Sequence, residues 1–320
     1  FTQKIMHILI TGGCGYTGTV LTKNLLDHGC KVTIIDIQWF GNFLKKNKNL
    51  KIIKTDIRHI KESYFKGVDA VVHLANIAND PSVELNPQLS WEVNVLATKK
   101  LIEYSINKNV KQFIFASSGS VYGVKKEKHV TENLDLVPIS TYNKTKMIAE
   151  RVLKSYESEI KFHSIRPATV CGYSPRMRFD VSVNMFVLQA LKDKKLNILG
   201  GQQIRPNIHI QDLSNIYTHF IENRKNIKSG FYNAGFENLK IIDIAKLVQK
   251  FIPSKIIIKK NNNDPRSYRQ NSDKILKTGF KRKHSVEEAI QEIKSMFEGK
   301  KIKVNATNFT VKWMKKLKIN

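Results

Sequence analysis

The chain has 320 residues, of which 41% are hydrophobic and 25% are charged, as is typical of a globular protein with a large core. Its net charge of +27 comes from lysine and arginine residues spread along the whole sequence, which favours a solvated basic surface that attracts anionic substrates over a nucleic-acid site. No apolar run reaches the ~20 residues of a membrane span, no signal-like segment opens the chain, and three scattered cysteines, Cys14, Cys30 and Cys171, indicate neither disulfides nor a zinc site. We therefore expect a cytoplasmic protein without membrane contact, nucleic-acid partner or metal ion.

Apolar strand-like runs alternate with helix-like segments through the first half of the chain. Strands are expected at residues 5–10, 31–37, 51–56, 70–74, 112–116 and 162–166. The helices expected between them cover residues 16–28, a long stretch from Pro87 to about 107, and residues 142–156. Near-continuous apolar strands separated by helices predict an α/β fold with a Rossmann-type, doubly wound parallel sheet.

Beyond residue 168 the pattern is less regular. Residues 169–180 look loop-like, helices are expected at 181–195, 211–222, 241–251 and 286–297, and short strands at 205–210 and 255–260. We interpret residues 1–170 as the Rossmann domain, with 204–226 returning to it, and residues 171–203 and 227–320 as a smaller, C-terminal substrate-binding lobe. The basic final segment, 300–320, carries spaced apolar residues and is expected to pack onto the body.

A glycine-rich loop joins the first strand to the first helix. The run Gly13-Cys14-Gly15-Tyr16-Thr17-Gly18 fits G-x-G-x-x-G in the strand–loop–helix context of a dinucleotide site. Glycine lets backbone N–H groups approach a pyrophosphate, and the helix N-terminus adds positive potential. Asp36 ends the second strand, where an acid can bind the adenosine ribose hydroxyls, and Ile37, Gln38 and Trp39 provide no cation for a 2′-phosphate. The sequence therefore favours NAD over NADP.

A second group of residues provides chemistry. Tyr142 and Lys146 lie four residues apart, on one face of a predicted helix. A tyrosine hydroxyl has a pKa of ~10, which a nearby ammonium and a positive nicotinamide ring would lower, so that the tyrosinate takes a proton from a sugar hydroxyl while hydride leaves. Residues 117–123 follow the strand 112–116, whose C-terminal end faces the cofactor crevice in this topology. A serine hydroxyl there can therefore bond the reacting oxygen.

These motifs resemble those of the extended short-chain dehydrogenase/reductases, in particular their branch of NAD-dependent nucleotide-sugar epimerases and dehydratases. TGGCGYTG, HLAN, SSGSVYG and YNKTK carry the resemblance, and TDIR, VNVLAT, RPATVCG and RPNIHIQD follow in the family's order. The resemblance covers nearly the whole chain. It implies NAD as cofactor, a nucleotide-diphosphate sugar as substrate, and a homodimer formed through the helices at about 88–108 and 142–157.

The resemblance also implies roles for individual residues. Ser118, Tyr142 and Lys146 match the family's catalytic serine, tyrosine and lysine. The cofactor-binding residues implied are Gly12, Gly15, Tyr16, Thr17, Gly18, Asp36, Asp56, Ile57, Leu74, Ala75, Asn94, Ser117, Tyr142, Lys146, Pro167 and Ala168. The substrate-binding residues implied are Asn76, Ser118, Asn184, Arg205 and Arg266.

Three positions depart from the family's pattern. Thr17 stands where an aliphatic residue is usual, and Asn76 replaces the usual alanine or glycine. An arginine that the family uses for the substrate diphosphate is asparagine here, so Arg266, or alternatively Arg269, is expected to replace it. The segment GYSPRMRFD, residues 172–180, resembles a subset of the branch that acts on deoxy- or heptose-type sugars. In it Arg176 and Arg178 either contact a phosphate or lie on the surface.

The residues after Ser118 bear on the reaction. Dehydratases of this branch carry an Asp-Glu pair there, whereas Gly119 and Ser120 have no acid–base capacity. The resemblance therefore implies an epimerase that inverts the sugar at C4 through a transient 4-keto-sugar. A 4,6-dehydratase is disfavoured. A 4-dehydrogenase or 4-keto-reductase would use the same residues and stays the alternative. A dinucleotide-binding regulator without activity is disfavoured by the complete Ser-Tyr-Lys set.

Overall fold

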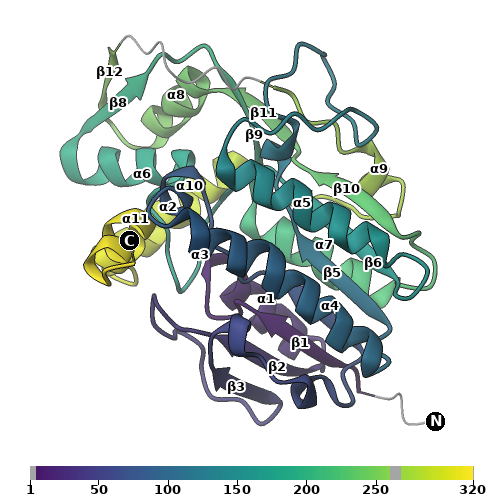
Figure 1. The fold of residues 1–320 in the computed structure, drawn as a ribbon. Helices are drawn as coiled ribbons and strands as arrows, with labels where there is room; N and C mark the ends of the chain where they lie inside the picture. Colours follow the sequence, from purple (N-terminus) through teal and green to yellow (C-terminus); the bar gives the residue numbers. More distant parts are fainter. Residues whose placement is uncertain (1–4, 260–267, 320) are drawn as a thin grey trace.

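The computed structural model describes residues 5–259 and 268–319. Within these residues seven strands form one sheet in the order β10-β6-β5-β4-β1-β2-β3, and each pairs in parallel with its neighbours (Figure 1). The strands are β1 (His7–Thr11), β2 (Lys31–Asp36), β3 (Leu50–Lys54), β4 (Ala70–His73), β5 (Gln112–Ala116), β6 (Phe162–Pro167) and β10 (Gly230–Ala234). The expected Rossmann-type α/β fold is confirmed.

Helices cover both faces of this sheet (Figure 1). On one face α1 (Tyr16–Asp27) packs beside α7 (Ile210–Glu222). The other face carries α3 (Pro87–Trp91), the π-helical turn η3 (Glu92–Leu96), α4 (Ala97–Asn107) and α5 (Thr141–Ser155). Along β1 the side chains alternate, so that Ile8 and Ile10 join the core under α1 and α7 while Leu9 joins the core under α4 and α5. Burial on both faces explains the near-continuous apolar sequence of the strand.

The smaller lobe is built around a third hydrophobic core. In it α6 (Ser182–Asp193) packs against α8 (Ile241–Phe251) and α10 (Val286–Glu298). The strands β8 (Lys195–Leu199) and β12 (Lys255–Lys259) pair in parallel beside them, and β7 (Thr169–Cys171), β9 (Ile204–His209) and β11 (Glu237–Lys240) form a separate three-stranded sheet. The short elements are η1 (Ile57–His59), η2 (Glu62–Phe65), α2 (Asp80–Val83), η4 (Gly119–Tyr122), α9 (Asp273–Leu276), η5 (Ala306–Asn308) and α11 (Thr310–Lys316).

The chain returns to the main sheet at a different strand from the one expected. Within residues 204–226 only α7 covers that sheet, because β9 pairs with β7 and β11 instead. Strand β10, which the sequence placed in the smaller lobe, adds to the edge of the main sheet beside β6. Its sequence, GFYNA, is short and partly polar, so it lacks the continuous apolar run typical of a buried parallel strand.

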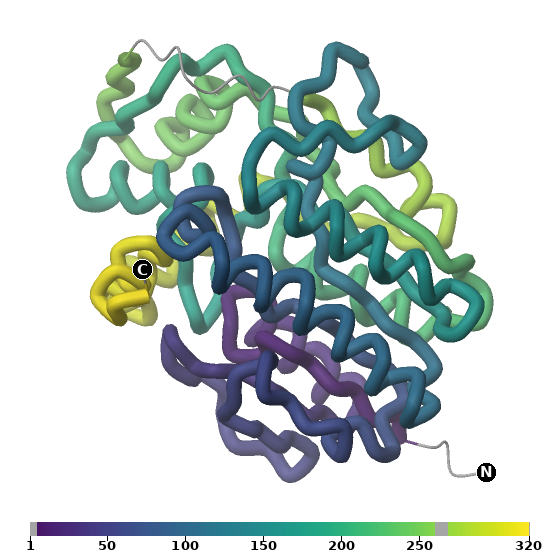
Figure 2. The backbone as a smooth tube through the Cα atoms, viewed as in Figure 1, coloured from purple at the N-terminus to yellow at the C-terminus, as the bar shows by residue number. Residues whose placement is uncertain are grey.

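The C-terminal segment packs against the body, as its apolar spacing predicts. Helix α11 lies between the smaller lobe and the N-terminal part of the main domain (Figure 2). Met314 is buried in the core under α4 and α5, and the Trp313 indole N–H donates to the carbonyl of Trp39 over 2.5 Å. The segment therefore ties the two parts of the molecule together.

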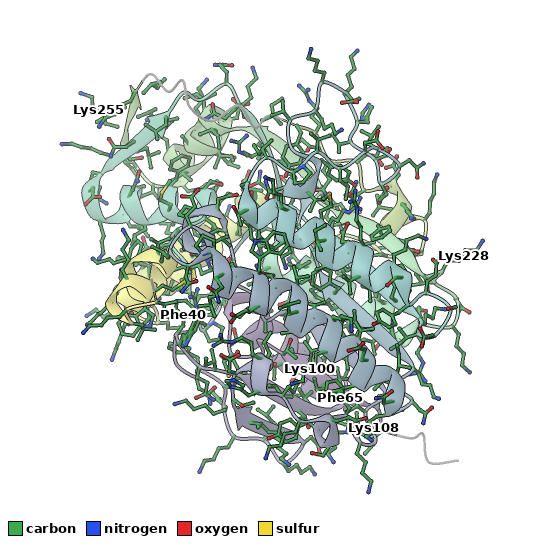
Figure 3. The ribbon with its side chains drawn as sticks, in the orientation of Figure 1. Phe40, Phe65, Lys100, Lys108, Lys228 and Lys255 are labelled. Atoms are coloured by element: carbon green, nitrogen blue, oxygen red, sulfur yellow. The ribbon has the colours of Figure 1, made fainter. Side chains whose placement is uncertain are left out.

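Basic side chains project from separate parts of the surface. Figure 3 shows Lys100 and Lys108 along α4, Lys228 near the edge of the main sheet and Lys255 on the smaller lobe. This distribution agrees with a solvated basic surface rather than a single basic stripe. Among the helices of the two described stretches, none combines the length and the apolar character needed to cross a bilayer.

Candidate active site

The carboxyl ends of the central strands open into a cavity of about 1000 Å³. Gly12, Asp36, Leu74, Ser117 and Pro167, which lie at or just after the ends of five parallel strands, line one side of it. Side chains of the smaller lobe line the other side. Ligands of doubly wound sheets bind in this position, outside the carboxyl ends of the strands. The volume lies at the upper end of the range for ligand pockets and suits two ligands held together.

The glycine-rich loop forms a tight turn at the bottom of the cavity. Gly12 has a φ of +75°, and a Cβ on it would lie 2.6 Å from the backbone nitrogen of Ala75. A Cβ on Gly18 would lie 2.3 Å from the Gly12 carbonyl oxygen, so the first turn of α1 packs directly on the loop. The first hydrogen bond within α1 runs from the Thr19 N–H to the Gly15 carbonyl, which leaves the earlier N–H groups of the helix available for an anion.

Asp36 is held rigidly at the end of β2. Its carboxylate accepts hydrogen bonds from the backbone N–H groups of Cys14 (2.9 Å) and Gln38 (2.6 Å). Burial raises the pKa of Asp36, and these two hydrogen bonds act in the opposite direction. Asp56 and Ile57 line the cavity a short way along the sheet. The residues present therefore fit the adenosine half of a dinucleotide.

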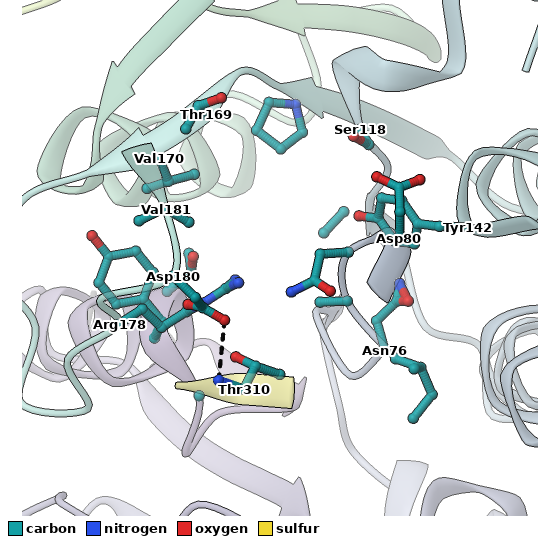
Figure 4. A pocket seen from close by; sticks show the side chains of 18 of the residues that line it. Asn76, Asp80, Ser118, Tyr142, Thr169, Val170, Arg178, Asp180, Val181 and Thr310 are labelled. Carbon is teal, nitrogen blue, oxygen red and sulfur yellow. Dashed lines mark hydrogen bonds and ion pairs between the residues drawn. The ribbon is translucent and has the colours of Figure 1, made fainter. Parts of the chain in front are cut away.

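Tyr142 and Ser118 face each other at the other end of the cavity (Figure 4). Tyr142 comes from the first turn of α5, where Ser140 caps the helix by accepting a hydrogen bond from the Asn143 N–H. Burial raises the pKa of Tyr142 to about 12, an effect that Asp80 increases and that the Ser118 hydroxyl and Arg178 reduce. The tyrosine is therefore protonated at neutral pH in the ligand-free protein.

Lys146 lies behind Tyr142 rather than in the cavity lining. Its ammonium donates to the Ala116 carbonyl over 2.5 Å and lies 4.8 Å from the centre of the Phe115 ring. Burial lowers the pKa of Lys146 to about 7, although Glu150 acts in the opposite direction. Arg178 is the cation that lowers the Tyr142 pKa here, and the effect of Lys146 together with a bound nicotinamide ring stays a prediction.

Ser118 is the outermost member of a chain of polar groups. Its hydroxyl lies 2.7 Å from that of Ser120, which donates to the Asn143 side-chain carbonyl over 2.6 Å. Because Ser120 has one hydroxyl proton and gives it to Asn143, the proton between the two serines comes from Ser118. To donate to a sugar oxygen, the Ser118 hydroxyl must turn away from Ser120. Ser120 therefore connects Ser118 to Asn143 by hydrogen bonds, a role that was not expected from the sequence.

The structure brings most of the implied site residues together. The residues of the implied set that line the cavity are Gly12, Gly15, Tyr16, Thr17, Gly18, Asp36, Asp56, Ile57, Leu74, Ala75, Asn76, Ser117, Ser118, Tyr142, Pro167, Ala168 and Arg205. Arg266 lies outside the described residues. Lys146, Asn94 and Asn184 are buried beside the cavity but do not line it.

Asn94 and Asn184 hold neighbouring segments instead. Asn94 bonds both backbone groups of Ile77 and the Thr145 hydroxyl, so it fixes the strand-end loop that borders the cavity. Asn184 accepts from the Gly172 N–H and donates to the Tyr16 hydroxyl and the Arg178 carbonyl. Both side chains are therefore placed to support the cavity walls.

Some cavity residues, such as Asp80 and Thr310, were not singled out from the sequence, whereas Arg176 and Arg178 were expected either on a phosphate or on the surface. Asp80 lies close to Tyr142, and across the cavity Arg178 forms a 2.8 Å ion pair with Asp180, which accepts from the Thr310 N–H (Figure 4). Arg176 is 3% exposed and the Arg178 side chain is 17% exposed, so neither lies on the open surface. A local motif does not reveal such residues, because they reach the cavity from distant segments.

The fold and the cavity are those of a dinucleotide-binding class of α/β proteins, with a tyrosine and a serine at one end of the cavity. Comparison with known proteins identifies the family: its model, described as the NAD dependent epimerase/dehydratase family, matches residues 8–235. This chain belongs to that family, which confirms the resemblance and NAD as the family's cofactor.

Individual relatives agree with this assignment. An uncharacterized UDP-glucose epimerase of Bacillus subtilis is 31% identical over 259 residues, 76% of this chain and 81% of the relative. The structure of a UDP-N-acetylglucosamine 4-epimerase from Methanobrevibacter ruminantium, in complex with UDP-N-acetylmuramic acid, is similar with a TM-score of 0.85 and 25% identity, covering 93% of this chain and all of that one. A UDP-glucuronic acid 4-epimerase from Bacillus cereus, bound to UDP-glucuronic acid and NAD, gives a TM-score of 0.80 and 26% identity over 92% of this chain and 99% of that one.

Proposed function

We propose that this protein is an NAD-dependent nucleotide-sugar epimerase that inverts the sugar at C4 through a transient 4-keto-sugar. One observation carries the proposal: Tyr142 and Ser118 line the same cavity as the glycine-rich loop and Asp36, while the two residues after Ser118 are Gly119 and Ser120. The cavity therefore provides for proton and hydride transfer at one carbon, without the acidic pair that dehydration uses in this family.

Each proposed role follows from the position of the side chain. When bound, NAD supplies the hydride acceptor at its nicotinamide ring. Tyr142 takes the proton of the sugar C4 hydroxyl and returns it to the oxygen after the sugar has turned over. Ser118 positions that oxygen. Lys146, fixed on the Ala116 carbonyl, is placed to bind the nicotinamide ribose and to stabilise the tyrosinate once Tyr142 has lost its proton.

The decisive experiment is incubation with a panel of UDP-sugars without added NAD. We expect C4 epimers to form, as detected by proton NMR, without net NADH, because the hydride returns to the opposite face of the same sugar. Stoichiometric NADH with an oxidised sugar would instead identify a 4-dehydrogenase, the alternative that shares these residues. Loss of water from the sugar would contradict the proposal as well, and would direct attention to Asp80 as the acid.

We also infer that two copies associate through the outer faces of α4 and α5. Leu96, immediately before α4, is 61% exposed, and an exposed leucine on a helix face suits an isologous contact. The molar mass from light scattering is expected to equal two chains. Leu96→Glu is expected to lower this molar mass towards that of one chain. If the unaltered protein already has the molar mass of one chain, the inference is wrong.

A further inference from the structure

Arg176 is a buried cation whose guanidinium lacks a hydrogen-bond partner on two of its nitrogens. The side chain is 3% exposed, lies in the cavity lining, and leaves Nε and Nη1 unbonded. Its guanidinium carbon lies 4.0 Å from the centre of the Phe40 ring, close enough for a cation–π contact. This contact orients the group, but it satisfies none of its N–H donors.

The segment that carries Arg176 is anchored to the helix behind the glycine-rich loop. Ser174 donates to the carbonyl of Tyr16 over 2.7 Å, and its oxygen lies 2.7 Å from the Thr19 hydroxyl. The Tyr16 hydroxyl in turn donates to the carbonyl of Gly172 over 2.7 Å. These contacts hold the segment against the first turn of α1, two residues before Arg176.

The segment is also held on the other side of Arg176. The Asn308 side chain donates to the carbonyl of Met177, and the Phe179 N–H donates to the carbonyl of Asn308. Met177 and Phe179 are themselves buried. Arg176 is therefore fixed from both directions, and it cannot turn its charge to solvent without breaking this packing.

The two acids that act on Arg176 are already engaged. Asp36 accepts from two backbone N–H groups, and Asp180 is paired with Arg178. Burial lowers the pKa of Arg176 to about 9, and Arg178 adds to this effect, whereas Asp180 and Asp36 oppose it only in part. A buried charge without a partner is costly, so the site calls for an anion that the protein itself does not provide.

We propose that Arg176 binds the diphosphate of the NAD cofactor, so that the smaller lobe supplies a cation to a ligand otherwise held by the glycine-rich loop. Its segment is anchored on Tyr16, at the N-terminus of α1, and its guanidinium lies on the ring of Phe40, four residues after Asp36. These two contacts place Arg176 where a diphosphate leads to the adenosine ribose. A 2′-phosphate is disfavoured there, because it would lie against the Asp36 carboxylate. The proposal rests on the proposed cofactor site and not on the reaction.

The test measures binding to the NAD-free protein by calorimetry, with NAD, ADP, adenosine and NADP as separate ligands. We expect Arg176→Met to raise the Kd for NAD and for ADP about 10- to 100-fold, the range for losing a charged hydrogen bond, and to change the Kd for adenosine less than 2-fold. Arg176→Lys keeps the charge without the planar fork and should give an intermediate Kd. Arg282→Met, at an exposed position outside the cavity lining, is the matched control and should bind like the unaltered protein.

Thermal unfolding provides a second readout. Without NAD, the melting temperature of Arg176→Met should be no lower than that of the unaltered protein, because the substitution removes a buried charge without a partner. Saturating NAD should raise the melting temperature of Arg176→Met less than it raises that of the unaltered protein. A lower melting temperature without NAD would show that the guanidinium supports the fold itself and would overturn the proposal. So would an unchanged Kd for NAD, an equal loss for adenosine, or a preference for NADP that disappears in Arg176→Met. Because none of these measurements involves turnover, they stand whether or not epimerisation is observed.

Discussion

Tyr142→Phe is expected to lower kcat by about 10²- to 10⁴-fold, the range for losing a positioned general base, while leaving NAD binding nearly unchanged. Only the hydroxyl is lost, so the ring still fills its place between α5 and the cavity. The measurement is the rate of C4 inversion at saturating UDP-sugar, together with the Kd for NAD. Without this hydroxyl, the proton of the sugar C4 hydroxyl must be accepted by water or by Ser118.

The matched control is Tyr104→Phe, the same change on α4. Tyr104 packs edge-on against Phe65 and lies outside the cavity lining, so this variant should retain the unaltered rate. Full turnover in Tyr142→Phe would remove Tyr142 from the mechanism. Equal losses in both variants would point to a general effect of the substitution on packing.

Gly18→Ala is expected to abolish NAD binding at accessible concentrations and to lower the melting temperature. The added Cβ would lie 2.3 Å from the Gly12 carbonyl oxygen and 2.6 Å from the Gly13 Cα, and these backbone atoms cannot move without opening the loop. Overpacking of this kind typically costs about 1–3 kcal/mol of unfolding free energy. The measurements are thermal unfolding without ligand and calorimetric titration with NAD.

Gly15→Ala gives a graded comparison within the same loop. Its Cβ would meet only the Gly12 carbonyl, at 3.2 Å, and Gly15 has a φ of −78°, which alanine adopts readily. We expect a smaller loss of stability than in Gly18→Ala. If both variants melted alike, the close approach of α1 to the loop would not be the cause of the effect.

The cavity depends on segments that converge from the whole chain. Trp39 and Phe40 after β2, Arg178 and Asp180 before α6, and α11 at the C-terminus all border it. The hydrogen bonds from Trp313 to Trp39 and from the Thr310 N–H to Asp180 fasten the last helix across the junction of the two lobes. The basic C-terminal segment therefore helps to shape the proposed active site.

The sequence by itself determined the features that depend on residues close together in the chain. The strand–loop–helix around Gly13–Gly18, the acid at Asp36 and the helical spacing of Tyr142 and Lys146 each lie within about 25 residues. A parallel sheet then brings the ends of its strands to one edge whatever the intervening loops contain. For this reason the fold and the part of the cavity lining that lies at the strand ends could be predicted without coordinates.

Only the tertiary structure decided which way the remaining side chains turn and what faces them. It placed Asn184 on Tyr16 rather than in the cavity, Lys146 on the Ala116 carbonyl, and β10 at the sheet edge. It also showed that Arg176 is buried, whereas the sequence was equally compatible with an exposed Arg176 and with one that contacts a phosphate. These outcomes depend on contacts between residues that are 30 or more positions apart, from Lys146 on Ala116 to Asn308 on Met177 and Ser174 on Tyr16. Local propensity and spacing carry no information about such contacts, because they arise only when distant parts of the chain pack together.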